Sequence, residues 1–263
     1  MHHHDYGGLH EDLKRTGAAM KRRDVLRLAM GGVGMGAVYL FGRADEVRGV
    51  EGGGANCEKI PEETAGPFPA DGSNGPDVLS KAGVVRSDIR SSFAGLSGAA
   101  AGVPLTVMLQ LVELQQGCAP AAGLAVYVWH CDAAGLYSLY NRGATDQNYL
   151  RGVQESDAGG EVSFTTIFPG CYRGRWPHIH FEIFRDLAAA ADAGDKIATS
   201  QLAFPEAACA EVYGAQGYDA SARTFQRASL TRDSVFRDGV DRQMATMSGD
   251  AASGFAAELT IAV

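Results

Sequence analysis

The segment Arg175–Phe181 reads Arg-Trp-Pro-His-Ile-His-Phe and opens a run of apolar and aromatic residues that ends at Phe184. In an extended strand, side chains two positions apart lie on the same face. His178 and His180 therefore point to one side of a strand and Ile179 to the other. Two neutral imidazoles with this spacing supply half of a metal site. The pattern alone is a weak signal, because alternating histidines also occur in strands as hydrogen-bonded core residues.

Short runs of the same character occur on both sides of this segment. They are rich in Val, Ile, Leu, Thr and aromatic residues, and turn material such as Asp157–Gly160 separates them. This spacing predicts an all-β protein with a single β-sandwich domain, long loops and little helix. Strands are expected at Leu105–Leu114, Leu124–His130, Val162–Ile167, His178–Phe184, Ser200–Phe204 and Phe255–Val263, a short helix at Ala207–Tyr213, and a loop in the Ala-rich insertion around Leu187–Ala191.

Composition and charge argue against a nucleic-acid-binding protein. The chain has 263 residues, of which 46% are hydrophobic, and a formal net charge of -8. Residues 1–44 hold seven Lys or Arg against four Asp or Glu, which leaves 16 basic and 27 acidic residues in the rest of the chain. A nucleic-acid-binding protein needs a basic face, so this composition predicts no nucleic-acid partner.

The basic head of the chain has the features of an export signal. Residues 21–27 read Lys-Arg-Arg-Asp-Val-Leu-Arg, and a weakly apolar, Gly-rich stretch follows at 28–42. The paired arginines before such a stretch resemble a bacterial twin-arginine signal, and the stretch is short for a membrane span. An uncleaved anchor and a buried helix are the alternatives. We therefore expect a signal segment at 1–44, a flexible Gly/Pro-rich arm at 45–76, a β-sandwich at 77–263, and no stable membrane span after processing.

Five cysteines follow the signal segment. In an exported protein some of them are expected to pair, and an odd count leaves at least one unpaired. Their spacing does not reveal the connectivity. A disulfide at Cys171 would stiffen the loop that carries Tyr172. The five are Cys57, Cys118, Cys131, Cys171 and Cys209.

Two tyrosines become notable when they are combined with the histidine pair. Tyr137 ends the run Ala-Gly-Leu-Tyr, and Tyr172 ends the run Pro-Gly-Cys-Tyr. A single tyrosine is usually an amphipathic core residue. Here each lies just after a glycine-containing turn, and the second lies six residues before His178.

These motifs together resemble the intradiol ring-cleavage dioxygenases, whose core is like that of protocatechuate 3,4-dioxygenase. The matching features are the Trp-x-x-x-x-Ala-Gly-x-Tyr region ending at Tyr137, the Pro-Gly-x-Tyr ending at Tyr172, and Arg175-x-x-His178-Ile-His180. A Gln201-Leu-x-Phe204 run also fits, so the resemblance covers roughly residues 60–205. It implies a β-sandwich that binds iron(III) through Tyr137, Tyr172, His178 and His180.

The implied chemistry suits these residue types. Iron(III) is a hard cation that favours anionic phenolate oxygens and lowers their pKa. The resemblance implies that a catechol binds as a dianion, that Tyr172 is the ligand it displaces, and that dioxygen then cleaves the ring between the two hydroxylated carbons. The expected product is a cis,cis-muconate-type diacid. Arg175 is expected to stabilise negative charge on the substrate, and Gln201 to orient dioxygen or substrate.

Two other functions remain open at this point. One is a secreted β-sandwich binding module that keeps the fold without catalysis. The other is a zinc or copper enzyme that uses His178 and His180 together with His130, although tyrosinates suit zinc poorly. The catechol and hydroxyquinol branches of the family also carry a helical N-terminal dimerisation region that is not recognisable here. This difference favours a separate, exported branch of the family and argues against that familiar dimer, while an oligomer of another kind is possible.

Overall fold

The computed structural model describes residues 57–192, 194 and 196–263. These residues fold into two β-sheets in which most neighbouring strands are antiparallel. The signal segment expected at 1–44 and residues 45–56 of the expected arm lie outside this range. The first sheet has the order β2-β1-β9-β8, and β5 pairs with β1. Its strands are β1 (Pro104–Glu113), β2 (Ala119–Pro120), β5 (Glu161–Ile167), β8 (Thr246–Asp250) and β9 (Gly254–Ala262).

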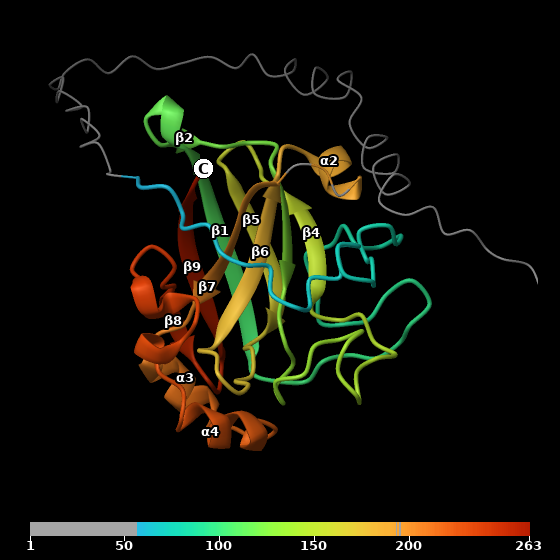
Figure 1. Ribbon diagram of the computed structural model, residues 1–263, viewed down its shortest axis with the longest axis vertical. Helices are drawn as coiled ribbons and strands as arrows, with labels where there is room; N and C mark the ends of the chain where they lie inside the picture. The colour runs from blue at the N-terminus through green and yellow to red at the C-terminus, as the bar shows by residue number, and fades with distance from the viewer. Residues whose placement is uncertain (1–56, 193, 195) are drawn as a thin grey trace, which may run out of the picture.

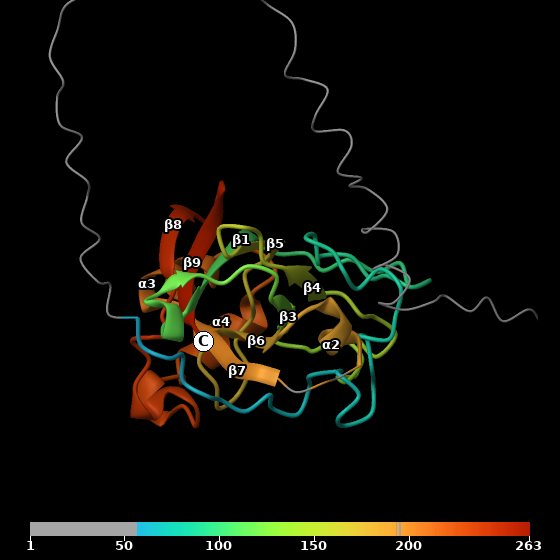
Figure 2. The same cartoon turned by 90° about the horizontal axis from the view of Figure 1, so that it is seen from above.

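The second sheet carries the predicted histidine strand at its centre and has the order β4-β3-β6-β7. All neighbours in it are antiparallel, and His180 on β6 is opposite Trp129 on β3 and Gln201 on β7. Figure 2 shows the two sheets as stacked layers, so the fold is the predicted β-sandwich. The strands are β3 (Ala125–Trp129), β4 (Arg151–Glu155), β6 (His178–Phe184) and β7 (Lys196–Ala203).

Every second side chain of a strand points to the same face, and the side chains that point between the two sheets form the core. On β6, the odd-numbered Ile179, Phe181 and Ile183 join a buried apolar cluster with Val126 and Val128 of β3. The facing residues of the first sheet belong to the same cluster. They are Leu105, Val107, Leu109 and Leu111 of β1, Val162 and Phe164 of β5, and Phe255, Ala257, Leu259 and Ile261 of β9.

The outer face of the second sheet is buried too. Tyr127 and Trp129 of β3 belong to a separate apolar cluster with Ala70 and Leu79 of the preceding segment and with Tyr137 of the β3–β4 connection. All seven residues of β6 are consequently buried, the three polar ones included. A polar side chain on this face must find its partners inside the protein.

Residues 57–76 form part of the cover over this face and are not a free arm. The segment is extended, as expected, and crosses β6 and β7 on their outer side (Figures 1 and 2). Backbone N–H groups of Ile60 and Glu63 donate to the carbonyls of Ala262 and Thr199, at 3.0 and 2.7 Å. The expectation of a flexible arm is therefore wrong for residues 57–76, because hydrogen bonds and burial hold them against the sandwich.

One disulfide anchors the start of this covering segment. Cys57 is bonded to Cys118 in the β1–β2 connection, whereas Cys131, Cys171 and Cys209 are buried free thiols. The disulfide considered for Cys171 is thus not formed.

A buried arginine holds the same cover further along the chain. Arg151 is fully buried, and its guanidinium donates to the Pro69 carbonyl at 2.9 Å and to the Ser138 carbonyl at 3.0 Å. It also donates to the Ser138 hydroxyl at 3.0 Å. Arg151 therefore joins the covering segment to the connection that carries Tyr137.

Helix is scarce, as predicted, although α2 (Leu187–Ala191) and α4 (Asp219–Phe225) form where no helix was expected. The Ala-rich insertion expected as a loop forms a short helix, because the Asp186 side chain accepts the Ala189 N–H and caps its first turn. No helix among residues 57–192, 194 and 196–263 is long and apolar enough to cross a membrane. The helices are η2 (Leu114–Gln116), α2 (Leu187–Ala191), α3 (Glu206–Val212), α4 (Asp219–Phe225), η3 (Leu230–Arg232) and η4 (Phe236–Asp238).

We predict that the disulfide contributes measurably to stability. It closes a loop with a sequence separation of 61, and such cross-links typically stabilise a fold by about 2–4 kcal/mol. The double variant Cys57→Ser/Cys118→Ser should lower the free energy of unfolding in urea by this amount. A reducing agent should lower that of the wild type equally and leave the variant unchanged. Wild-type stability that is insensitive to reduction and equal to that of the variant would contradict the prediction.

Candidate metal centre

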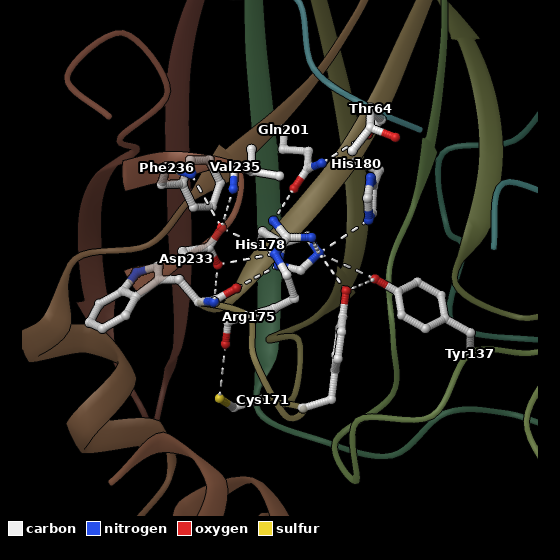
Figure 3. A network of polar contacts seen from close by, with 12 residues as sticks. Thr64, Tyr137, Cys171, Arg175, His178, His180, Gln201, Asp233, Val235 and Phe236 are labelled. Atoms are coloured by element: carbon white, nitrogen blue, oxygen red, sulfur yellow. Dashed lines mark hydrogen bonds and ion pairs between the residues drawn. The ribbon is translucent and has the colours of Figure 1, made fainter. Parts of the chain in front are cut away.

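The two histidines of β6 lie on its outer face, as the alternation predicts. Both are buried, and their Nε2 atoms are 3.1 Å apart. Figure 3 shows both imidazoles and the Tyr137 hydroxyl converging on one point. The sheet therefore places two imidazole nitrogens at one point beneath the covering segment.

Neighbouring groups fix the orientation of each imidazole. Nδ1 of His178 lies 2.5 Å from the Trp176 carbonyl oxygen, so this nitrogen carries the proton and Nε2 keeps its lone pair. The ring of His180 stacks on Trp129, with centroids 4.8 Å apart and an interplanar angle of 6°. Gly66, at a φ of +69°, passes over His180, and a Cβ there would lie 3.4 Å from its Cε1.

Two glycine-containing loops bring the tyrosines to the same point. A Cβ on Gly170 would lie 2.4 Å from the Asp132 carbonyl oxygen, and the Gly170 N–H donates to that same oxygen at 3.1 Å. Gly135, at a φ of +86°, also lies against the Tyr172 loop, since a Cβ there would lie 3.2 Å from the Cys171 carbonyl oxygen. Both glycines are thus required for the loops of Tyr137 and Tyr172 to pack backbone against backbone.

Four donor atoms converge as a result. Nε2 of His178 is 3.1 Å from the Tyr172 Oη and 3.4 Å from the Tyr137 Oη, and the two phenol oxygens are 3.4 Å apart. The single lone pair on the His178 Nε2 can accept only one good hydrogen bond, so hydrogen bonding does not account for all of the close contacts of this atom. Metal bonds of about 2.0–2.1 Å place neighbouring ligand atoms about 3.0–3.4 Å apart. The spacing of the four atoms therefore fits a single metal ion.

Burial keeps each of these groups neutral in the protein alone. It raises the pKa of Tyr172 to about 12 and the pKa of Tyr137 well above its usual range. It lowers the pKa of both His178 and His180, whose lone pairs are then free of protons at neutral pH. A bound multivalent cation acts in the opposite direction on the phenols and favours phenolates. The site is thus a set of neutral donors that a hard cation would ionise.

Arg175 lies beside the four donors and is held from two sides. Its Nε donates to the Asp233 carboxylate at 3.0 Å, and its Nη2 donates to the Gln201 Oε1 at 2.5 Å. Its Nη1 is 3.4 Å from the Nε2 of His178. Figure 3 shows the guanidinium between Asp233 and Gln201. A fixed positive charge therefore borders the donor cluster.

Gln201 has both ends of its amide engaged. Besides accepting from Arg175, it donates its Nε2–H to the Thr64 carbonyl at 2.9 Å. The residue lies on β7 opposite His180 and is fully buried. Its contacts link the covering segment to Arg175, which favours a positioning role over direct contact with dioxygen.

His130 does not join the cluster. Its Nδ1 is 2.8 Å from the Cys131 carbonyl and its Nε2 is 2.7 Å from the Thr166 hydroxyl. Both ring nitrogens thus have protein partners. Moreover, no group of three or more His, Cys, Asp or Glu that could bind a metal occurs in the described part of the chain. The zinc or copper alternative with His130 therefore has no site here.

Asp233 is the site residue that the sequence did not suggest. It is buried between η3 and η4, and its carboxylate also accepts the backbone N–H groups of Trp176, Val235 and Phe236. Its partner Arg175 is 58 residues away in the chain. No local period or motif marks the position, so only the folded structure reveals it.

Comparison with known proteins gives the family. A family model described as Dioxygenase matches residues 74–206, just over half of the chain. The match contains the Tyr137, Tyr172 and His178–His180 motifs. No curated protein sequence matches the chain.

Solved structures agree with this assignment. An intradiol ring-cleavage dioxygenase from Tetranychus urticae has a TM-score of 0.61 and 25% identity, covering 78% of this chain and 94% of that chain. The dioxygenase domain of a dioxygenase carbohydrate-binding protein fusion from Streptomyces sp. SirexAA-E has a TM-score of 0.50 and 22% identity, covering 78% and 98%. The second likeness supports the fold alone. The chain belongs to the intradiol ring-cleavage dioxygenases, a family that typically uses non-haem iron.

Proposed function

We propose that this protein is a non-haem iron(III) dioxygenase. Its reaction cleaves a catechol-type ring between the two hydroxylated carbons with dioxygen, and the product is a cis,cis-muconate-type diacid. The observation that carries the proposal is the convergence of two phenol oxygens and two imidazole nitrogens at 3.1–3.4 Å in a buried space. Membership of the family supports the reaction class.

The donor set suits iron(III). Tyr137 and Tyr172 would hold it through Oη, and His178 and His180 through Nε2. Two phenolates reduce the charge of a trivalent cation in a buried site, which lowers the cost of desolvation. Bound iron(III) would supply the Lewis acidity and the electron-accepting capacity that make a catecholate reactive toward dioxygen.

Tyr172 is the donor best placed to move a proton. It is partly exposed, whereas Tyr137 is 1% exposed and its ring packs on Phe68 with centroids 4.8 Å apart. As a phenolate, the form that bound iron(III) would favour, the Oη of Tyr172 could accept a proton from an incoming catechol hydroxyl. Tyr137 stays in place and fixes the geometry.

Arg175 supplies a preorganised positive charge. Its guanidinium is 13% exposed and paired with a fully buried carboxylate, so it needs little reorganisation when charge develops on the substrate. Gln201 keeps Nη2 in position through a 2.5 Å hydrogen bond. Arg175 stabilises negative charge on the ring, and Gln201 and Asp233 position it.

Export through the bacterial twin-arginine route belongs to the proposal. Arg22 and Arg23 precede a Gly-rich, weakly apolar stretch. The Cys57–Cys118 disulfide supports an oxidising compartment, because structural disulfides are rare in the bacterial cytoplasm. The substrates would then be catechols outside the cytoplasm.

We predict a visible spectrum that depends on Tyr172. The iron(III)-loaded protein should be red-brown from phenolate-to-iron charge transfer, and its absorption should shift to longer wavelength when catechol is added without oxygen. Tyr172→Phe should lose part of this absorption and about 10²–10⁴-fold in oxygen uptake, the range for loss of a general base.

Tyr140→Phe is the control for this measurement. The Tyr140 ring also packs near Phe68, but its hydroxyl bonds to Ala70 and Asn74 and not to the cluster. It should keep both colour and turnover. A wild type that stays colourless after iron(III) is supplied would contradict the proposal and leave the binding module as the better account.

We predict that Arg175→Gln separates turnover from metal binding. The variant should keep its colour, because Arg175 is not a donor, and lose about 10²–10³-fold in kcat/KM, as when one preorganised charge stabiliser is removed. Asp233→Asn should give a smaller loss. Arg185→Gln, at an exposed arginine near α2, is the matched control. Unchanged turnover in Arg175→Gln would rule out its proposed role.

We predict that export requires both arginines of the pair. Arg22→Lys/Arg23→Lys should retain the protein in the cytoplasm of a bacterial host, and Arg27→Lys should not. Cell fractionation with immunoblotting measures the distribution. Equal export of the double variant would exclude the twin-arginine route.

A further inference from the structure

A groove lined by arginines lies outside the donor cluster. Its volume is about 880 Å³, and it is formed by the loop after Tyr172, helix α4, the segment that follows α4, and η3. Arg173, Arg223, Arg227 and Arg232 line it, and the other lining residues are uncharged. Four guanidinium groups therefore share one concave surface.

This concentration of positive charge is unusual for the chain. The protein has a formal net charge of -8, yet no carboxylate lines the groove. Within residues 57–192, 194 and 196–263, none of these four arginines forms an ion pair, unlike Arg175, Arg90 and Arg242. Like charges held together repel one another unless an anion lies between them. The groove thus has the electrostatics of an anion-binding site.

The geometry of the groove favours a small ligand. A volume of about 880 Å³ lies within the range of pockets for small molecules, about 300–1,000 Å³. Guanidinium groups bind carboxylates through paired N–H donors. The Arg232 Nη2 donates only to the Arg227 carbonyl, at 3.4 Å, so its remaining N–H groups are available.

The groove is connected to the candidate metal centre through one loop. Arg173 and Gly174 line the groove, and their chain neighbours Tyr172 and Arg175 belong to the centre. The Ser221 hydroxyl of α4 accepts the Cys171 N–H at 2.8 Å, which fixes this loop to the helix. A ligand in the groove therefore contacts the outer side of the loop that carries Tyr172.

We propose that this groove binds a small organic anion with two carboxylates, of the class that ring cleavage would release. The identity of the ligand rests on the proposed function, because that reaction converts an uncharged catechol into a diacid. Four guanidinium groups can pair with two carboxylates bidentately, whereas the donor cluster binds the diphenol. The groove holds the product outside the centre, next to the loop that carries Tyr172 and Arg175.

The test is direct binding to the full-length, iron-loaded protein. Isothermal titration at low salt compares cis,cis-muconate with sorbate, a six-carbon diene acid with one carboxylate. We expect muconate to bind at least about tenfold more tightly than sorbate, and added salt to weaken it, because the arginines are exposed. Arg223→Gln/Arg227→Gln should weaken muconate binding at least about tenfold. Arg185→Gln, near α2 at the opposite end of the sandwich (Figure 1), should not.

Several outcomes would overturn the proposal. Muconate binding that is the same in the double variant would place the diacid elsewhere, for instance in the metal centre. If inorganic sulfate at the same concentration displaces muconate, the groove binds anions in general and is not selective for a dicarboxylate. Circular dichroism checks that the double variant is folded, and Arg223→Lys/Arg227→Lys, which keeps the charge, should bind with intermediate affinity. Oxygen uptake with catechol is measured separately, so failure of the catalytic proposal is distinguishable from failure of this one.

Discussion

The site depends on one constraint, which is that strand β6 is buried on both faces. Its odd-numbered side chains fill the core between the sheets, so its even-numbered ones must lie on the outer face. That face carries His178 and His180, and the covering segment closes it from water. A one-residue slip of β6 against β3 or β7 would move the imidazoles into the apolar core. The apolar residues of β6 therefore determine its register against β3 and β7, and this register determines where the two histidines lie.

Burial also defines the electrostatics of the cluster. Desolvation raises the pKa of Tyr137 and Tyr172 and lowers that of the two histidines, so all four donors are uncharged in the protein alone. The cluster can then be assembled during folding without burying net charge. Ionisation of the phenols would then require a bound cation to compensate their charge. The same burial leaves the His178 lone pair with too many neighbours for hydrogen bonding to satisfy, which favours a metal-binding state.

Features with a local signature could be predicted from the sequence, and those set by distant partners could not. Period-two alternation predicts β6, and the glycines before Tyr137 and Tyr172 mark loops that pack tightly. Strand β4 reads Arg-Gly-Val-Gln-Glu, which lacks the β signature; it forms because it pairs with β3 and because Ile89 packs where a Cβ on Gly152 would lie. The order of residues 57–76 likewise comes from contacts across the chain.

The charge beside the cluster illustrates why this long-range information matters for function. Arg175 is two residues past a solvent-exposed arginine, and nothing in its immediate sequence distinguishes a fixed guanidinium from a mobile one. Three distant segments make the difference: Asp233 binds Nε, Gln201 binds Nη2, and Thr64 holds the Gln201 amide. Asp233 is itself held by three backbone N–H groups. A charge restrained in this way is oriented before substrate arrives, whereas an exposed arginine such as Arg173 loses side-chain entropy whenever a ligand orders it.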